Sequence, residues 1–289
     1  MSDEMRRAPE LLAPMVDRYA GPPMELDELR AGDAREAPEA VRRAHAEVRD
    51  EEIAGVHCTW LDPGLRDQGL LVSLHGGGYW VGPGALHWEW FSTLCRATGR
   101  AGLLIRYARA PEATYPLALE QAQAVARTLD GPWWLVGDSA GAALGVALAA
   151  RLRGTPHAPR GMVLSSPWMD ITMRHPQMLA NQHLDVMLGV PALDRYAAGY
   201  AGATDRAHPE LSPLNLDPAG LPPMLVTVGT AELFLWEIRD WARTCAAAGT
   251  PCEVIEVEGA IHDFAIMLAL LPEAREVLPA QVAFLQRTA

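Results

Sequence analysis

Short apolar runs alternate with longer amphipathic stretches along most of the chain. The runs predict strands at 55–60, 69–75, 101–107, 132–137, 161–166, 223–229 and 252–258. The stretches between them predict helices near 85–98, 116–129, 140–153, 232–248 and 273–287. Strands that are apolar throughout and alternate with helices are typical of a mostly parallel sheet covered on both faces. The pattern therefore predicts an α/β fold.

Two regions interrupt this alternation. Residues 1–50 show no strand pattern, and the stretches 11–20 and 35–52 predict two polar helices around a Pro-rich link. Between 166 and 222 no strand is expected either, although helical pieces are predicted at 178–184 and 190–202. Insertions of that length usually form a lid over a site. We expect an N-terminal helical segment over 1–50 and an α/β domain over 51–289.

The composition narrows the classes of partner and chemistry. The formal net charge of −12 opposes binding to a phosphate backbone. The N-terminus carries charges where a signal peptide needs an apolar core, and the apolar run near 140–150 is too short to span a membrane. Every basic residue is arginine, so a Schiff base and a phosphate-loop lysine are excluded. The four cysteines form no C-x-x-C pair. We expect a cytoplasmic, soluble protein with reduced thiols and no metal, nucleic-acid or membrane partner.

The most informative motif is Gly137-Asp138-Ser139-Ala140-Gly141, directly after a predicted strand and at the start of a helix of small residues. A serine on a tight strand-to-helix turn projects its hydroxyl above the sheet, and the flanking glycines avoid clashes in the strained turn. The helix N-terminus adds unpaired N–H groups and the positive end of the helix dipole. The motif predicts a nucleophilic serine whose neighbour Ala140 offers an oxyanion donor.

A second motif, His75-Gly76-Gly77-Gly78, ends the strand expected at 69–75. Successive glycines leave backbone N–H groups uncovered, so a substrate oxygen can approach them. Upstream of a candidate nucleophile, such a loop is expected to supply the rest of the oxyanion hole. We expect His75 itself to stabilise the turn and not to act as a base.

The base and the acid are expected after the serine, in the order Ser, acid, His. His262 follows the last predicted strand, on a loop at the carboxyl edge of the sheet. Glu232 lies shortly after the preceding strand and can orient the imidazole. Glu237 and Asp240 are alternatives further along the same segment, which we expect to face solvent from the following helix.

These motifs together resemble the α/β-hydrolase superfamily, in particular its hormone-sensitive-lipase-like branch of carboxylesterases. The resemblance covers residues 55–289. Further segments that match are 107–122 (YARAPEATYPLALEQA), 165–172 (SSPWMDIT) and 208–214 (HPELSPL). The first departs from the family's Y-R-L-A-P-E pattern at Ala108 and Arg109. The chain also has Glu232 where the family commonly has the aspartate of D-P-L-x-D.

The resemblance implies an α/β-hydrolase fold, a mostly parallel sheet with helices on both faces and a helical cap. It implies a triad of Ser139, Glu232 and His262. The oxyanion donors would be the N–H groups of Gly77, Gly78 and Ala140. The cap would consist of the N-terminal helices and an insertion at about 173–210. The reaction implied is cofactor-free hydrolysis of a small-molecule carboxylic ester with a short to medium acyl chain.

Two other functions remain open from the sequence. An amidase or arylformamidase is one, because the loop HGGGYW partly resembles the loop of those enzymes. A non-catalytic receptor on the same fold is the other, although such proteins tend to lose the catalytic histidine. We expect Trp80, immediately after the oxyanion loop, to contact the substrate and restrict its size. A homodimer is compatible with the sequence.

Overall fold

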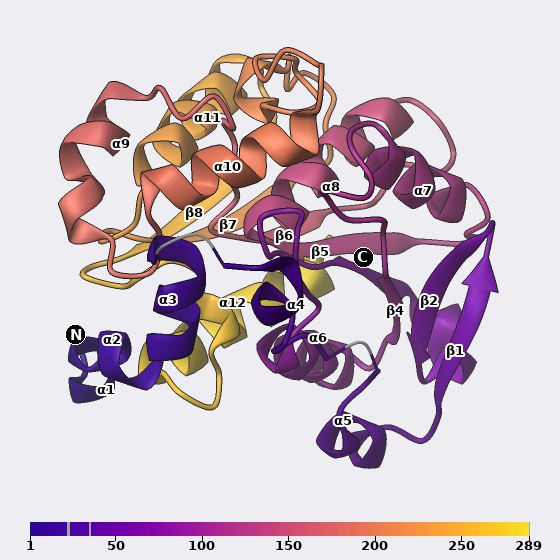
Figure 1. Ribbon diagram of the computed structural model, residues 1–289. Coiled ribbons are helices and arrows are strands. Elements are labelled where there is room, and N and C mark those ends of the chain that lie inside the picture. Colours follow the sequence, from indigo (N-terminus) through magenta and orange to yellow (C-terminus); the bar gives the residue numbers. More distant parts are fainter. Residues whose placement is uncertain (22–23, 35, 289) are drawn as a thin grey trace.

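The computed structural model describes residues 1–21, 24–34 and 36–288, and its centre is one mixed sheet (Figure 1). In the described residues the sheet has eight strands in the order β1-β2-β4-β3-β5-β6-β7-β8. The strands are β1 (Val48–Ile53), β2 (Val56–Leu61), β3 (Leu70–Leu74), β4 (Ala101–Ile105), β5 (Trp133–Asp138), β6 (Met162–Ser165), β7 (Met224–Gly229) and β8 (Cys252–Val257). Strand β2 is antiparallel to β1 and β4, and the remaining pairs are parallel. The predicted α/β sheet is confirmed.

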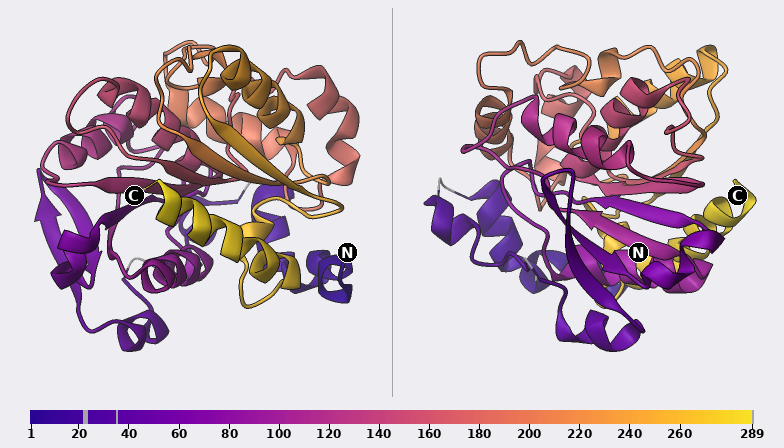
Figure 2. Two further views of the ribbon diagram at one scale, coloured as in Figure 1. Left: turned by 180° about the vertical axis from the view of Figure 1, so that it is seen from behind. Right: turned by 90° about the vertical axis from the view of Figure 1, so that its right-hand side faces the viewer.

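Helices cover both faces of the sheet (Figure 1, Figure 2). One face carries α7 (Leu117–Ala126), α8 (Ser139–Leu152) and α11 (Leu235–Ala247), and the other carries α6 (Ala85–Thr98) and α12 (Pro272–Arg287). Each of these helices was predicted to within a few residues. Strands β3 to β7 are buried along their whole length. This burial explains why they read as continuous apolar runs.

The prediction for residues 48–52 was wrong. They form β1 instead of the end of a helix, of which only α5 (Glu39–Ala44) remains, and residue 35 lies outside the described residues. Strand β1 pairs with β2 through a tight turn at Ala54 and Gly55, both with positive φ. It is an edge strand whose central residues are charged and exposed, as is common where an edge must resist pairing with other chains. The sheet therefore begins before the expected boundary at residue 50.

Helix α8 lies very close to the sheet, which its small residues permit. A Cβ at Gly141 would come within 2.1 Å of the Leu74 carbonyl oxygen. All residues of the first three turns of α8 are buried. The glycine of the serine motif is therefore required by packing as well as by the turn, and it fixes the helix N-terminus against the end of β3.

Helix α3 (Ala13–Ala20) of the N-terminal segment packs on α10 (Val190–Ala201) of the long insertion. The N-terminal segment also contains α1 (Asp3–Arg6), α2 (Ala8–Leu11) and α4 (Leu26–Leu29), and the insertion also contains α9 (Pro176–Asn181). Short 3₁₀ helices lie at Pro63–Gln68, Gln182–Leu184, Pro213–Asn215 and Phe264–Ile266. Helix α3 contacts α10, and the Gly189 N–H donates to the Tyr19 carbonyl at 2.9 Å. Within the described ranges, no helix combines the length and apolarity needed to cross a bilayer.

Candidate active site

Ser139 occupies the turn between β5 and α8, with a φ of 48°. A non-glycine residue at positive φ is strained, and such strain is common at functional sites. The N–H of Trp168 donates to the Ser139 carbonyl at 3.1 Å, which ties the turn to the loop after β6. Ser139 retains only 7% of its surface exposed. The side chain is therefore held in a buried position at the carboxyl edge of the sheet.

The structure brings His262 to this serine, although 122 residues separate them in the chain. His262 Nε2 lies 3.1 Å from Ser139 Oγ. The imidazole is buried and packs edge-on against Phe234, with ring centroids 5.0 Å apart. A hydroxyl within hydrogen-bond distance of an imidazole is the geometry that proton transfer requires.

Glu232 lies on the other side of the imidazole. Its Oε1 is 3.6 Å from His262 Nδ1, and its Oε2 accepts from Ser166 Oγ at 2.8 Å and from the Gly229 N–H at 3.0 Å. Ser166 Oγ also accepts from the Asp263 N–H at 3.0 Å, so this hydroxyl links the acid loop to the histidine loop. The carboxylate is thus anchored through one oxygen and presents the other to the ring. Sequence reasoning did not single out Ser166, which lies in the SSPW segment.

Sequence reasoning also missed Asp263, the residue that follows the histidine. Its Oδ2 lies 3.1 Å from His262 Nε2, the same nitrogen that faces Ser139. Burial lowers the pKa of His262, but Asp263 and Glu232 together raise it well above its ordinary value. Burial raises the pKa of Asp263 to about 6. This carboxylate therefore favours the protonated form of the imidazole.

The glycine loop lies beside the serine. Gly77 and Gly78 have positive φ and both border the cavity that contains Ser139 and His262. In the part of the chain that the structure describes, neither N–H has a hydrogen-bond acceptor. Ala140 is the second residue of α8, where the helix itself supplies no acceptor. The structure thus brings the glycine loop to the cavity of Ser139, and Ala140 follows this serine directly at the helix N-terminus.

A second imidazole, His87, also borders this cavity and was not anticipated. Its Nε2 lies 3.2 Å from Asp138 Oδ2, and its Nδ1 accepts from the Gly84 N–H at 2.9 Å. Burial lowers the pKa of His87, but the Asp138 carboxylate raises it to a net value above the ordinary one. Asp138 Oδ2 also accepts the Gly76 N–H at 3.0 Å. The residue before Ser139 therefore connects the serine turn to the glycine loop and to α6.

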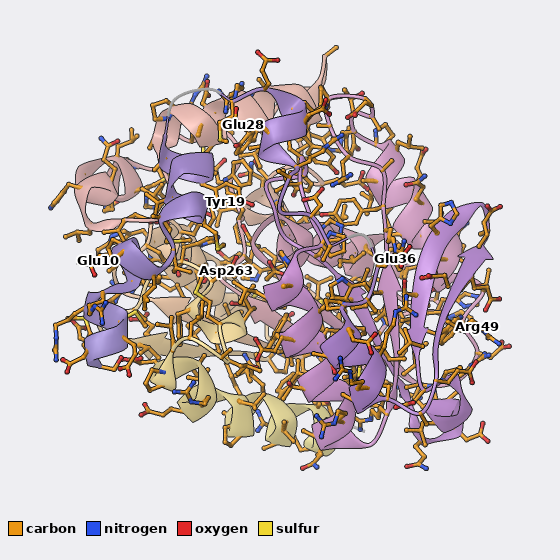
Figure 3. The ribbon with its side chains drawn as sticks, turned by 60° about the horizontal axis from the view of Figure 1, so that its bottom comes forward. Glu10, Tyr19, Glu28, Glu36, Arg49 and Asp263 are labelled. Atoms are coloured by element: carbon orange, nitrogen blue, oxygen red, sulfur yellow. The ribbon has the colours of Figure 1, made fainter. Side chains whose placement is uncertain are left out.

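The cavity itself is small and mostly apolar. Its volume is about 40 Å³. Its lining comprises Met15, Tyr19, Gly77, Gly78, Leu86, His87, Ser139, Met187, Leu188, Leu193, His262, Asp263, Ile266 and Met267. Tyr19 and Asp263, from opposite ends of the chain, both belong to it (Figure 3). A cavity needs about 10–15 Å³ to hold one water molecule, so this one has room for roughly three groups of that size.

The expectation that Trp80 contacts the substrate is not supported by its position. Trp80 is absent from the cavity lining, and its Nε1 donates to the Tyr196 carbonyl at 3.1 Å. The indole lies against Gly199 of α10, where an added Cβ would come within 2.2 Å of it. These two contacts hold the indole against α10.

The expectation that Glu237 faces solvent was wrong. Glu237 is fully buried, and its Oε1 accepts the Met169 N–H at 2.8 Å. Burial raises its pKa well above the ordinary value. Asp240 is partly exposed and pairs with His175 at 3.3 Å. Neither side chain approaches the imidazole as Glu232 does.

His75 is buried behind the loop, where Nδ1 contacts the Gly76 carbonyl oxygen at 2.8 Å and the ring stacks on Tyr107 at 4.4 Å. Burial lowers its pKa to about 3. This position agrees with the expectation of a turn-stabilising residue. Among the described residues, no group of three His, Cys, Asp or Glu side chains is arranged to hold a metal ion.

Known proteins share both the sequence and the fold. Residues 71–266 match the family described as the alpha/beta hydrolase fold. An acetyl-hydrolase of Streptomyces hygroscopicus is 37% identical over 240 residues, 80% of either chain. The putative acetyl-hydrolase LipR of Mycobacterium tuberculosis is 32% identical and covers 95% of this chain and 89% of its own. The crystal structure of an esterase from the bacterial hormone-sensitive lipase family superposes with a TM-score of 0.86 and 28% identity, over 100% of this chain and 99% of that one. The chain belongs to the α/β-hydrolase superfamily, in its hormone-sensitive-lipase-like branch.

Proposed function

We propose that the protein is a serine hydrolase that cleaves carboxylic esters through an acyl-enzyme. Ser139 is the nucleophile, His262 the general base and Glu232 the acid that orients it. The observation that supports this proposal most directly is the 3.1 Å approach of His262 Nε2 to Ser139 Oγ, at a cavity that the glycine loop also lines. The esterase and acetyl-hydrolase relatives support the same reaction class.

In the first half of the reaction, His262 takes the Ser139 proton as Oγ attacks the ester carbonyl carbon. The N–H groups of Gly77, Gly78 and Ala140 stabilise the resulting oxyanion. Glu232 stabilises the imidazolium by its charge at Nδ1. The imidazolium then protonates the leaving alcohol, and the ester bond to the alcohol breaks. Water attacks the acyl-enzyme in the same manner and releases the carboxylic acid and free Ser139.

The size of the cavity favours short acyl chains within the short-to-medium range that the sequence predicts. A volume of about 40 Å³ suits an acetyl group better than a chain of eight carbons. A neighbouring cavity of about 220 Å³ shares Met15, Tyr19, Leu86 and His87 with it. We assign the acyl group to the small cavity and the alcohol to the larger one. In this proposal the N-terminal helices and the 173–210 insertion act as the cap that encloses both.

A panel of p-nitrophenyl esters and aryl amides tests this function. We expect the highest kcat/KM for acetate or propionate, and a decline of at least tenfold by octanoate. An acetanilide substrate should react far more slowly than the acetate ester. Faster turnover of the amide would make the protein an amidase, and no turnover of any substrate would favour a receptor. The cytoplasmic location and the homodimer stay predictions from the sequence.

A further inference from the structure

The loop between β3 and α6 carries Gly77 and Gly78, and one ion pair holds its far end. Asp33 Oδ1 accepts the Gly82 N–H at 2.8 Å, and Arg109 donates to the Gly82 carbonyl at 2.8 Å. Arg109 also pairs with the Asp33 carboxylate. Both polar backbone groups of Gly82 are thus bonded to a single charge pair. We refer to Asp33 and Arg109 together as the clasp.

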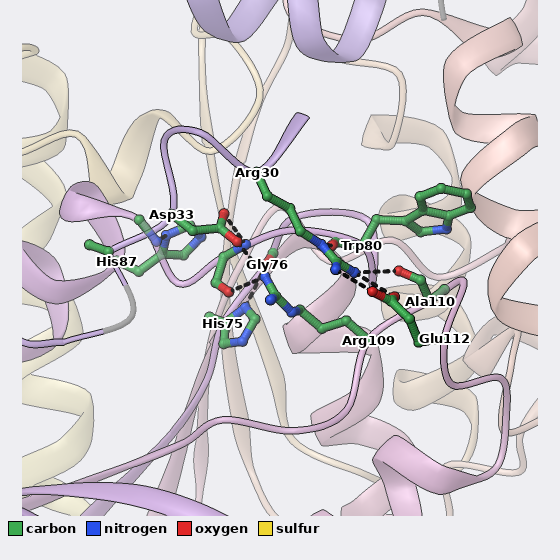
Figure 4. A network of polar contacts seen from close by, with 12 residues as sticks. Arg30, Asp33, His75, Gly76, Trp80, His87, Arg109, Ala110 and Glu112 are labelled. Atoms are coloured by element: carbon green, nitrogen blue, oxygen red, sulfur yellow. Dashed lines mark hydrogen bonds and ion pairs between the residues drawn. The ribbon is translucent and has the colours of Figure 1, made fainter. Parts of the chain in front are cut away.

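A second arginine restrains the middle of the loop. Arg30 Nε donates to the Trp80 carbonyl at 2.9 Å, and one of its terminal nitrogens donates to the Ala110 carbonyl at 2.8 Å. The same guanidinium forms two bonds with Glu112, at 2.6 and 2.8 Å (Figure 4). The Ala110 N–H donates to the Tyr79 carbonyl at 2.9 Å. The loop is therefore bonded at several successive peptide groups to the N-terminal segment and to the segment after β4.

These bonds reach the candidate oxyanion donors through the backbone. The N–H groups of Trp80 and Val81 donate to the Gly77 carbonyl at 3.0 and 3.1 Å. The Gly77 carbonyl and the Gly78 N–H belong to one planar peptide group, so fixing the first orients the second. Val81 precedes Gly82 directly, so a displacement of Gly82 would also move the Val81 N–H. This N–H is one of the two donors that hold the Gly77–Gly78 peptide plane.

The side chains of the clasp are largely buried, so forming this ion pair requires the desolvation of both charges. The Asp33 side chain is 4% exposed and that of Arg109 is 15% exposed. The desolvation of a buried ion pair costs free energy, and a hydrophobic pair of similar volume does not carry this cost. A buried ion pair is therefore weak evidence for a role in stability alone. Arg109 is also a position where the chain departs from the pattern of the family it resembles. Both members of this ion pair form hydrogen bonds with the backbone of Gly82. We therefore infer that the pair fixes the position of the loop.

We propose that Asp33 and Arg109 are positioning residues for the oxyanion hole. They fix Gly82, and through Val81 they fix the peptide plane that presents the Gly78 N–H to the substrate oxygen. The inference rests on the proposed function, because it requires that these N–H groups bind an oxyanion. A misplacement of about 1 Å at such a site can lower the rate by about a hundredfold.

The test compares Asp33→Asn, Arg109→Met and the double variant with the wild type, with p-nitrophenyl acetate as substrate. Each single variant leaves one charge buried without its partner, whereas the double variant removes both. We expect kcat to fall about 10- to 100-fold in all three variants. KM should change less than about threefold in Arg109→Met, because Arg109 borders neither substrate cavity, whereas Asp33 borders the larger one. Glu256→Gln is the matched control, since it removes a carboxylate that pairs with Arg239 at the β8 edge. That control should keep the wild-type kcat.

The double variant decides between positioning and simple charge burial. If its kcat returns to the wild-type value, the losses in the single variants came from the stranded charge and the proposal fails. A second readout is inhibition by 1,1,1-trifluoroacetone, whose adduct with a serine places an oxyanion in the hole. We expect its inhibition constant to rise by the same factor as kcat/KM falls, and an unchanged constant would overturn the proposal. A wild-type protein that neither hydrolyses the ester nor binds the ketone would overturn the proposed function as well.

Discussion

Asp263 Oδ2 lies 3.1 Å from His262 Nε2, the nitrogen that accepts the proton of Ser139 in the proposed mechanism. A carboxylate in this position stabilises the imidazolium, which cannot act as a base. It also competes with Ser139 Oγ for the same ring nitrogen, at the same distance of 3.1 Å. In the proposed mechanism the imidazolium must therefore lose the proton at Nε2 before it can accept that of Ser139.

This relationship predicts the pH dependence of the reaction. Since Asp263 and Glu232 outweigh burial and raise the pKa of His262 well above its ordinary value, kcat/KM should rise with pH through a midpoint above about 6.5. In Asp263→Asn the negative charge beside Nε2 is lost, so the midpoint should move to lower pH by about one unit or more. A pH profile of kcat/KM for both proteins measures the shift. An identical midpoint would show that Asp263 does not act on the imidazole.

The second prediction separates the two glutamates of the segment after β7. Glu232→Gln should lower kcat by about 10²–10⁴, because the amide lacks the charge that orients and stabilises the imidazolium. Glu237→Gln should lower kcat less than about threefold, because burial raises the pKa of Glu237 and glutamine resembles the neutral acid. Steady-state kinetics with p-nitrophenyl acetate measures both. A crippling effect of Glu237→Gln together with an active Glu232→Gln would reverse the assignment.

The third prediction concerns Trp80. Since its indole packs against α10 and not on the cavity, Trp80→Ala should leave the acyl-chain preference unchanged. The cost should appear as a loss of stability of roughly 2–4 kcal/mol, because the change opens a cavity beneath α10. Denaturant unfolding and the ester panel measure the two effects. A preference that moves to longer chains at unchanged stability would place the indole at the substrate.

The fourth prediction uses two glycines of α8 as a matched pair. A Cβ at Gly141 would meet the Leu74 carbonyl oxygen at 2.1 Å, whereas a Cβ at Gly145 would meet the Leu135 side-chain end at 2.4 Å. A backbone carbonyl cannot move aside as easily as the end of a leucine side chain. Gly141→Ala should therefore lower the free energy of unfolding by about 3 kcal/mol or more, and Gly145→Ala should lower it distinctly less. Thermal unfolding of both variants gives the comparison. An equal loss of stability in both variants would show that the close approach of α8 to β3 does not require glycine at position 141.

The sequence predicted the fold well because its central strands are buried on both faces and are apolar throughout. Strand β1 escaped prediction for the opposite reason, since Arg49, Glu51 and their neighbours are charged and exposed at a sheet edge. Its pairing with β2 depends on a turn at Ala54 and Gly55. The residues before this turn have a helical pattern, which led to the prediction of a helix instead of a hairpin.

Motifs that fix the backbone led to the candidate residues Ser139 and Gly77, which the structure brings to one cavity. Asp263 and His87 carried no motif, and only the tertiary structure brings them to the cavity. Trp80 follows the glycine loop closely in sequence, but its side chain packs against α10 instead of the cavity. The direction of a side chain after a glycine loop cannot be read from its neighbours in sequence.

The central claim is that Ser139 is the residue that carries the acyl group. Brief reaction with a fluorophosphonate, followed by peptide mass spectrometry, locates the modified residue, and the rate of ester hydrolysis is measured in parallel. We expect one adduct, on the peptide containing Ser139, formed in proportion to the loss of activity, and neither adduct nor hydrolysis in a folded Ser139→Ala variant. An adduct on another residue, or full activity in Ser139→Ala, would contradict the account.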